Sequence, residues 1–268
     1  MLLLLATAGC EQEPPSLTVG RILLSLPPQY DDKTADRDSL RQQVASRVAD
    51  TPRIKYAPNA RDAAYLATVT SEEVIELPGS GEQLRPVRVK LQALRGGPEF
   101  SAVGHGLPLT DIGASTLTGF DDAWRIIADE RGLGIAEDVK VIAALSHPDR
   151  RLREFAIEEL GDRRAKIAVE PLCKLLTTEP EAELVLRAIG ALVAIGDSRA
   201  AEPLIELARN KGPEVVIQIA YALGAVGGSV AEGYLVTLAS GHPIEEVRAA
   251  AEGALKDLAA KVKTRSAK

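Results

Sequence analysis

The chain has 268 residues, of which 46% are hydrophobic, 26% are charged and only 3% are aromatic. This composition is typical of a soluble globular protein with one or two domains, whose apolar side chains are mostly aliphatic. The net charge of −6 excludes nucleic acid as an expected partner, because phosphate binding needs a basic surface.

The chain begins MLLLLATAGC and then becomes polar with EQEPPS. The apolar run is much shorter than the ~20 residues that span a bilayer as a helix. It also has no polar face, whereas a helix that packs on a domain core with one side exposes polar residues on the other. An apolar run that ends in small residues is typical of a signal peptide, so we expect residues 1–16 to be a signal and tether.

The tetrad TAGC at residues 7–10 resembles the lipobox of bacterial lipoproteins, although that motif usually has Leu in place of Thr7. The resemblance implies that the Cys10 thiol carries a diacylglyceryl group and that the chain is cut before this residue. It further implies a protein held in the cell envelope by lipid, and Glu11 favours the periplasmic side of the outer membrane. The short apolar run, with no preceding Lys or Arg, indicates a natural start upstream of Met1. The alternative is a chance Cys in a disordered leader.

Residues 17–133 are expected to form an α+β domain with helices on one face of a sheet. Alternating apolar residues predict strands, Gly96-Gly97 predicts a turn between two of them, and an apolar face of Leu40, Val44 and Val48 predicts a helix. The expected strands lie at residues 21–26, 65–69, 87–91 and 100–104, and the expected helices at residues 36–50 and 120–133, with Asp121 capping the second.

No catalytic motif is recognisable in this first domain. The Gly104-His105-Gly106 segment is too short for a phosphate-binding loop, and no Ser-His-Asp or Cys-His set stands out. Acid pairs such as Asp31-Asp32 and Glu72-Glu73 are expected to be solvated in loops.

The second half of the chain repeats itself. The leucines that anchor the repeat are spaced by 32, 31 and 32 residues, and they are Leu160, Leu192, Leu223 and Leu255. Within one unit, Leu152, Ala156 and Leu160 share one face of a helix because they lie four residues apart. A second helix begins at Pro203 in one unit and Pro171 in another, and Asp197 after Gly196 suits a helix end followed by a cap.

This pattern resembles the HEAT family, and in particular its short repeats of the PBS-lyase HEAT-like type. The resemblance implies an all-α solenoid of stacked helix pairs over residues 136–262, followed by a disordered basic tail at residues 263–268. Val139, Ile142 and Leu145 are expected to form the second helix of an incomplete leading unit.

Two enzymatic members of the family can be compared with this chain. The iron-binding His-Glu pairs of deoxyhypusine hydroxylase have no counterpart, because the residues that follow the three histidines are Gly106, Pro148 and Pro243 rather than glutamates. His147 and His242 share one repeat position, which indicates a role in a turn. Bilin lyases act in a compartment that a lipoprotein leader would not reach. We therefore expect no metal, no cofactor and no catalytic residues.

Five polar residues of the second helices are the expected partner-binding set, because they lie opposite the core leucines: Glu170, Lys174, Glu202, Glu206 and Arg209. The alternative is that the glutamates only complement the positive amino-terminal ends of their helices. Cys173 is expected in the core, and it has no disulfide partner if Cys10 carries lipid.

The sequence thus predicts a non-catalytic envelope lipoprotein that acts as a protein–protein interaction scaffold through its HEAT-like array. An envelope enzyme or a lyase-type HEAT protein is the alternative. In a third interpretation the α+β domain binds the partner and the array only oligomerises.

Overall fold

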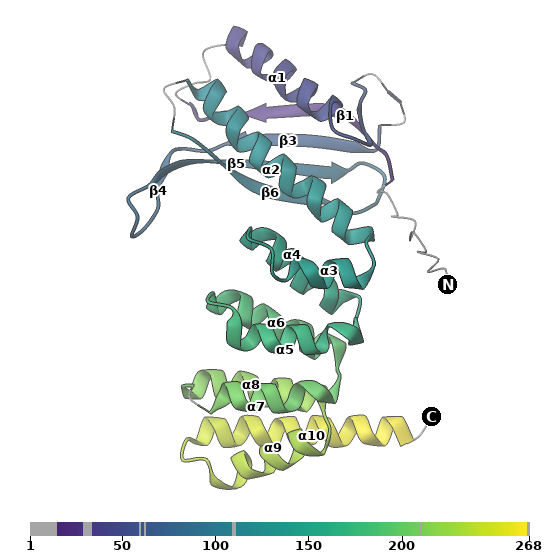
Figure 1. Ribbon diagram of the computed structural model, residues 1–268, viewed down its shortest axis with the longest axis vertical. Helices are drawn as coiled ribbons and strands as arrows, with labels where there is room; N and C mark the ends of the chain where they lie inside the picture. Colours follow the sequence, from purple (N-terminus) through teal and green to yellow (C-terminus); the bar gives the residue numbers. More distant parts are fainter. Residues whose placement is uncertain are drawn as a thin grey trace, which may run out of the picture. The chain divides into compact units, whose positions relative to one another are not determined.

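The structure is a computed structural model that describes residues 15–28, 34–58, 60–61, 63–108, 111–209 and 211–266 (Figure 1). Cys10 and the rest of the leader lie outside the described residues. The chain divides into two compact units, Met1–Ile135 and Ala136–Lys268. The first is an α+β unit and the second is a helical array, so the predicted fold class is confirmed.

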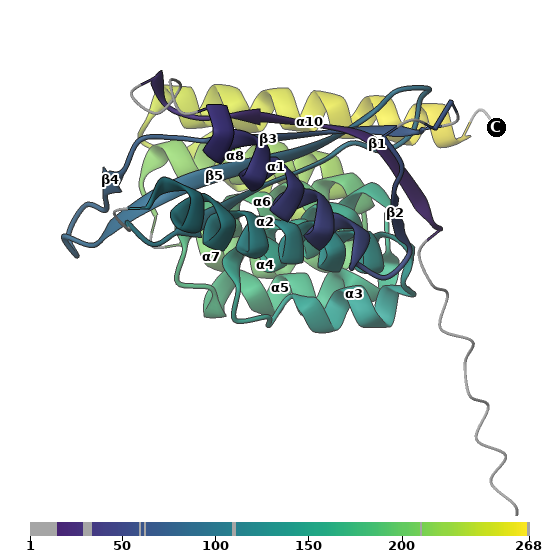
Figure 2. The same ribbon diagram turned by 90° about the horizontal axis from the view of Figure 1, so that it is seen from above.

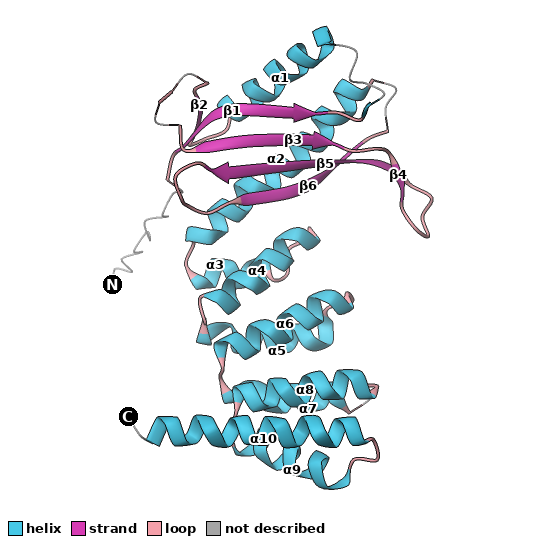
Figure 3. Ribbon diagram, turned by 180° about the vertical axis from the view of Figure 1, so that it is seen from behind, coloured by secondary structure: helices cyan, strands magenta, loops and turns pink. Residues whose placement is uncertain are grey.

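The α+β unit is built on a mixed six-stranded sheet with strand order β2-β1-β3-β5, in which β6 and β4 both pair with β5. β1 is parallel to β2 and β3, whereas β5 is antiparallel to β3 and β6. The two helices cover one face of the sheet, as the views from the front, from above and from behind agree (Figures 1, 2 and 3). The elements are β1 (Leu17–Ser25), α1 (Thr34–Ala49), β2 (Ile54–Tyr56), β3 (Tyr65–Ser71), β4 (Ile75–Glu76), β5 (Gln83–Ala93), β6 (Phe100–Gly106) and α2 (Ile112–Ile135).

The apolar patterns predicted most of this unit correctly. In β3, and in β5 from Val87 to Ala93, the alternate residues that face the helices are buried or partly buried, while their neighbours on the other face are at least partly exposed. In α1 the residues Leu40, Val44 and Val48 are buried, as their spacing predicted. The turn between β5 and β6 contains Gly96 and Gly97 with φ of 81° and 136°, values that favour glycine.

The start of α2 was predicted wrongly. The helix begins at Ile112 rather than near residue 120, and Asp121 lies inside it, where it forms an ion pair of 2.8 Å with Arg47 of α1. The capping carboxylate is that of Asp111, which accepts a hydrogen bond of 2.8 Å from the Gly113 N–H. The segment GASTLTG at residues 113–119 has low helix propensity, which hid the first two turns.

Those small residues are required by the close packing of α2 on the sheet. A Cβ atom at Gly119 would lie 2.4 Å from Cγ2 of Val87, and one at Gly104 would lie 1.9 Å from the Gly119 carbonyl oxygen. Tertiary contact therefore overrides local propensity here. It also explains Gly104 and Gly106, which lie in β6 beneath the helix rather than in a loop.

The second unit is an array of helices stacked in pairs (Figure 3). Helices α4, α6, α8 and α10 pack on one another in that order, and α5, α7 and α9 do the same in the other layer. The elements are α3 (Asp138–Ala144), α4 (Arg150–Asp162), η2 (Lys166–Ala168), α5 (Val169–Thr178), α6 (Ala182–Ile195), η3 (Ser198–Ala200), α7 (Ala201–Ala208), α8 (Pro213–Val226), α9 (Ser229–Gly241) and α10 (Glu245–Ser266).

The repeat register is as predicted in the central helices. The anchor residues Leu160, Leu192 and Leu223 are buried, and Leu255 in the last helix is only partly buried. Gly196 ends α6 in the left-handed conformation, and the Asp197 side chain then accepts the Arg199 N–H of η3.

The expectation for the leading helix α3 was right at Leu145 and wrong at Val139 and Ile142. The buried residues are Val141, Ala144 and Leu145, whereas Val139 is 67% exposed and Ile142 is partly exposed. Val141 and Ala144 are apolar like Val139 and Ile142, so composition alone could not choose between these two pairs. The choice comes from packing, because Val141, Ala144 and Leu145 have the i, i+3, i+4 spacing of a continuous helix stripe.

Candidate functional site

The site is built on the turns that connect one helix pair to the next. His147 Nδ1 accepts a hydrogen bond of 3.0 Å from the backbone N–H two residues later, and His242 Nδ1 accepts an equivalent one of 3.2 Å. Arg153 and Arg248 lie six residues after these histidines. Each donates from Nη1 to the His carbonyl, at 3.0 and 2.7 Å, and to the following Pro carbonyl, at 3.2 and 3.1 Å. The predicted role of both histidines in turns is therefore confirmed.

Sequence reasoning missed the two arginines, although a signal for them exists. The motif HPxxxxR occurs at residues 147–153 and again at residues 242–248. Its recurrence in the same phase of two repeats marks the arginine as a structural partner of the turn. A guanidinium group suits this role because its fixed fork of donors can bind two carbonyl oxygens at once.

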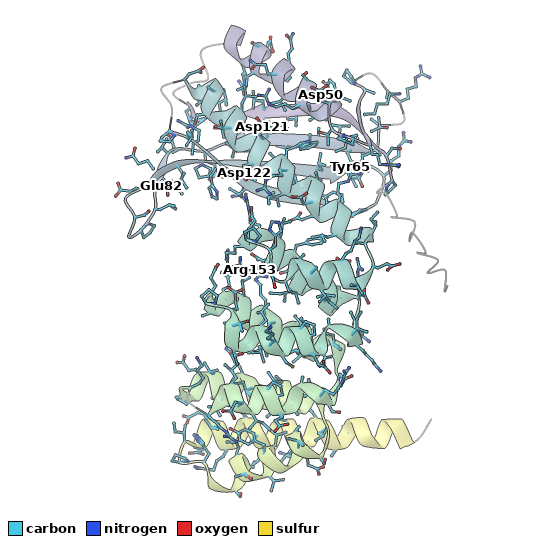
Figure 4. All side chains as sticks on the ribbon, viewed as in Figure 1. Asp50, Tyr65, Glu82, Asp121, Asp122 and Arg153 are labelled. Carbon is cyan, nitrogen blue, oxygen red and sulfur yellow. The ribbon has the colours of Figure 1, made fainter. Side chains whose placement is uncertain are left out.

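Arg153, which is labelled in Figure 4, also joins the first turn to the second one. Its Nε atom lies 3.1 Å from Glu179 Oε2, and its Nη2 atom lies 3.0 Å from Glu181 Oε1. The Arg153 and Glu179 side chains are only 14% and 5% exposed. The ion pairs of the Arg153 guanidinium with Glu179 and Glu181 thus hold the two turns together.

A second ion-pair group ties α4 to α6. Arg150 Nε lies 2.5 Å from a Glu181 oxygen, and Arg187 Nη2 lies 2.7 Å from Glu154 of α4. Arg150 and Arg187 both also pair with Glu183. These contacts cross from one helix pair to the next, so they fix the spacing of α4 and α6.

A hollow of about 770 Å³ lies between α3 and α5, and Arg153 forms part of its lining. Its floor contains Ile142, Leu145 and Leu175, and three prolines at the turns and at the start of α5 add further apolar surface. Its rim includes the exposed side chains of Glu170 and Lys174. The complete lining is Ile142, Leu145, Ser146, His147, Pro148, Arg153, Glu170, Pro171, Lys174, Leu175, Thr178, Glu179 and Pro180.

The five expected partner-binding residues are all exposed, but they fall into two groups. Glu170 and Lys174 lie on α5 and line the hollow. Glu202 and Glu206 lie on the next helix, α7, and Arg209 directly follows it; none of these three lines the hollow. Arg209 forms an ion pair of 3.1 Å with Glu206.

The two equivalent glutamates also fit the alternative interpretation. Glu170 and Glu202 both lie in the first turn of their helices, where a carboxylate complements the positive end of the helix dipole. Glu170 is 83% exposed and lies 3.7 Å from Arg199. Because the Glu170 carboxylate is so exposed, it can stabilise its helix and still be accessible to a partner.

Cys173 is not a core residue, contrary to expectation. It is only partly buried, and Val236 at the equivalent position of α9 is 51% exposed. The position therefore lies at the edge of the packed layer rather than within it. Burial raises the pKa of the Cys173 thiol to about 11, and Glu170 and Asp197 add to this while Arg199 opposes it. The thiol is thus protonated at neutral pH and a poor nucleophile.

Two further features concern the described part of the chain only. Within it, no group of three or more His, Cys, Asp or Glu side chains is arranged to hold a metal ion. Within the same residues, no helix combines the length and the apolar character needed to cross a membrane.

Comparison with known families supports the assignment of the array. Residues 139–224 and 169–256 each match the family model for HEAT repeats. The carboxyl-terminal region contains HEAT repeats. The two matches overlap and both lie within the helical unit that begins at Ala136, so the HEAT repeats coincide with the stacked pairs from α3 to α10. A search of curated proteins found no match to this chain.

Proposed function

We propose that this protein is a lipid-anchored envelope lipoprotein whose HEAT repeats, of the PBS-lyase HEAT-like type, bind a partner protein without catalysis. The observation that carries the binding role is the hollow between α3 and α5, which combines an apolar floor with a charged rim. HEAT repeats in general support a role in protein interaction or as a scaffold.

The chemistry of the hollow suits an extended segment of a protein. Ile142, Leu145 and Leu175 provide a surface on which an apolar side chain can be buried. At the rim, the exposed carboxylate of Glu170 and the exposed ammonium of Lys174 can pair with opposite charges of the partner and steer its approach.

Several polar groups of the lining are already occupied, which supports a binding role over a catalytic one. Arg153 is bonded to two backbone carbonyls and two carboxylates, and His147 Nδ1 accepts a backbone N–H. These hydrogen bonds and ion pairs fix the side chains that line the hollow. Side chains that are already ordered lose less conformational entropy when a partner binds.

The anchor is proposed at Cys10, on the resemblance of residues 7–10 to the lipobox. In the native protein, Cys10→Ala is expected to remove the chain from cell membranes that have been washed at high salt, a wash that releases chains held by charge alone. Persistence of this variant in the washed membrane pellet would argue against lipidation. The same proposal places the protein in the periplasm, on the inner side of the outer membrane.

The binding role is tested by reversing the charges at the rim. The double variant Glu170→Lys/Lys174→Glu keeps the net charge of the chain but inverts the local pattern. We expect it to lose crosslinked partner from envelope fractions while its melting temperature stays unchanged, because exposed substitutions rarely alter stability by more than ~0.5 kcal/mol.

A matched control uses the exposed pair Lys211 and Glu214, which lie outside the lining of the hollow. The double variant Lys211→Glu/Glu214→Lys should retain the partner. Equal capture by both double variants would show that the hollow is not the binding site.

A further inference from the structure

The point at which the leader joins the α+β unit is fixed by two hydrogen bonds. Arg131 of α2, which is 6% exposed, donates from Nη2 to the Pro15 carbonyl at 2.9 Å. Two residues later, the Leu17 N–H donates to the Arg53 carbonyl at 2.9 Å. The first described residues therefore leave the unit at a defined place, beside the start of β1 and the turn before β2.

A group of exposed cations surrounds this place. Lys55 of β2 is paired in the sheet with Thr18, and Arg53 contacts Leu17 through its backbone. Ala64 N donates to the Thr18 carbonyl at 3.0 Å and Leu94 N donates to the Ala64 carbonyl at 2.8 Å, so the segments before β3 and after β5 reach the same edge. The basic edge is defined here as the exposed residues Arg53, Lys55, Arg61 and Arg95.

The basic edge is held together and bears one exposed aliphatic residue. Arg95 Nη2 donates to the Arg61 carbonyl at 2.7 Å, which fixes the two loops to each other. Leu94, next to Arg95, is 55% exposed. Such a combination of basic and aliphatic side chains is typical of a surface that lies on lipid headgroups.

The local charge is opposite to that of the whole chain. Asp50 and Asp62 are the acidic residues nearest in sequence to the cations of the first loop, and Glu99 near Arg95 is paired with Lys90 at 2.9 Å. Glu11, Glu13 and Asp62 lie outside the described residues; among the described residues the four cations outnumber Asp50, whereas the chain as a whole carries a net charge of −6. A positive edge on an acidic protein is a specific feature of this surface rather than a consequence of composition.

We propose that the basic edge docks on the anionic phospholipid headgroups of the membrane that carries the protein. The inference rests on the lipid anchor of the proposed function and extends it to the orientation of the α+β unit. Cys10 and Pro15 are five residues apart, which an extended chain covers in at most about 18 Å. The short connection keeps the edge near the bilayer, where attraction to anionic lipid operates within a Debye length of ~8 Å.

The test uses the full chain without lipid, as the Cys10→Ala variant, and vesicles as the probe. Co-sedimentation is compared between vesicles of phosphatidylcholine alone and vesicles of phosphatidylcholine mixed with phosphatidylglycerol, at low and high salt. We expect binding to the mixed vesicles only, and its loss at high salt. Equal binding to both kinds of vesicle would overturn the proposal, because an apolar leader alone would not distinguish them.

Charge reversal then locates the contact. Lys55→Glu/Arg61→Glu is expected to weaken partitioning onto the mixed vesicles about tenfold or more, since each basic residue near an anionic surface contributes substantially. The matched control, Lys211→Glu/Lys256→Glu, makes the same charge change on the helical unit and should bind as the parent does. An equal loss in both variants would overturn the proposal, because it would reflect net charge alone.

The docking of the basic edge and the lipid anchor at Cys10 are tested by different measurements, so the failure of one can be told from the failure of the other. The vesicle assay involves no lipid modification, so it does not depend on Cys10. The anchor is measured separately, by the salt-washed membrane fraction of cells that express the native and the Cys10→Ala chains, because the wash releases chains held by charge alone. Lipidated Lys55→Glu/Arg61→Glu should remain in that fraction, because acyl chains hold it there.

Discussion

Gly224 of α8 and Ala254 of α10 lie in direct contact, with room for no further atom between them. A Cβ atom at position 224 would lie 2.9 Å from the Ala254 Cβ and 3.0 Å from its carbonyl oxygen. The same relationship occurs between Gly161 of α4 and Ala191 of α6, where the Cβ atom would lie 3.0 Å from the Ala191 Cα. Small residues thus set the spacing of successive helix pairs at these two places.

Gly224→Ala is expected to destabilise the array by about 1–3 kcal/mol, because the new methyl group overpacks the contact with α10. The measurement is the free energy of unfolding in urea. Gly190→Ala in α6 is the matched control, since a Cβ atom there meets nothing within 4 Å. The control should gain about 0.5–1 kcal/mol, as alanine favours the helix. A loss of stability in the control as well would show that these glycines act through the backbone and not through packing.

Leu192→Ala is expected to cost about 2–5 kcal/mol. Leu192 is 1% exposed in α6, and truncation removes buried apolar surface and leaves a cavity. An unchanged melting temperature would mean that the repeat register has been assigned incorrectly.

Glu179→Ala is expected to destabilise the turn between α5 and α6 by roughly 3 kcal/mol, because it leaves the largely buried Arg153 guanidinium without its main carboxylate. Glu170→Ala, at a carboxylate that is 83% exposed, should change stability by less than ~0.5 kcal/mol. Comparable effects of the two substitutions would show that burial does not distinguish these glutamates.

The contribution of Asp197 should depend on pH. Hydrogen bonds from the Arg199 side chain and backbone lower the pKa of this carboxyl below its usual value. A lowered folded-state pKa stabilises the protein above the pKa of the unfolded chain, and this stabilisation is lost as the pH falls through the folded-state value. Asp197→Ala should therefore cost about 1 kcal/mol at neutral pH, and the difference should shrink in acid below pH ~4. A difference that stays constant with pH would contradict this account.

The sequence predicted the elements whose signal is local. Val87, Val89 and Leu91 alternate and lie buried in β5, and the repeat spacing placed Leu160 and Leu192 in the core. The start of α2 was not predictable, because residues 113–119 have low helix propensity and the need for glycine at position 119 comes only from the close approach of α2 to Val87.

The candidate site was predictable only in part. Glu170 and Lys174 could be assigned to the polar side of α5 from periodicity. The hollow beside them depends on Arg153 and Glu179, which are 26 residues apart in sequence and meet only when the helix pairs stack. Charge pairs between successive turns have no periodic signal, so no single-helix pattern could reveal them.

The second group of the expected site is tested by Glu202→Lys/Glu206→Lys. These residues lie on α7 outside the lining of the hollow. If the partner extends along the second helices, the double variant should weaken capture, but less than the reversal at Glu170 and Lys174 does. A larger effect at α7 than at α5 would move the main contact away from the hollow.

The central claim, that the hollow between α3 and α5 receives a partner protein, is tested most directly by crosslinking in intact cells. A photoreactive amino acid is placed at position 174, on the rim of the hollow, or at position 256, which is exposed on α10. We expect a discrete protein adduct from position 174 that disappears in the Glu170→Lys background, and no such adduct from position 256. The absence of an adduct from position 174, or the same adduct from both positions, would contradict it.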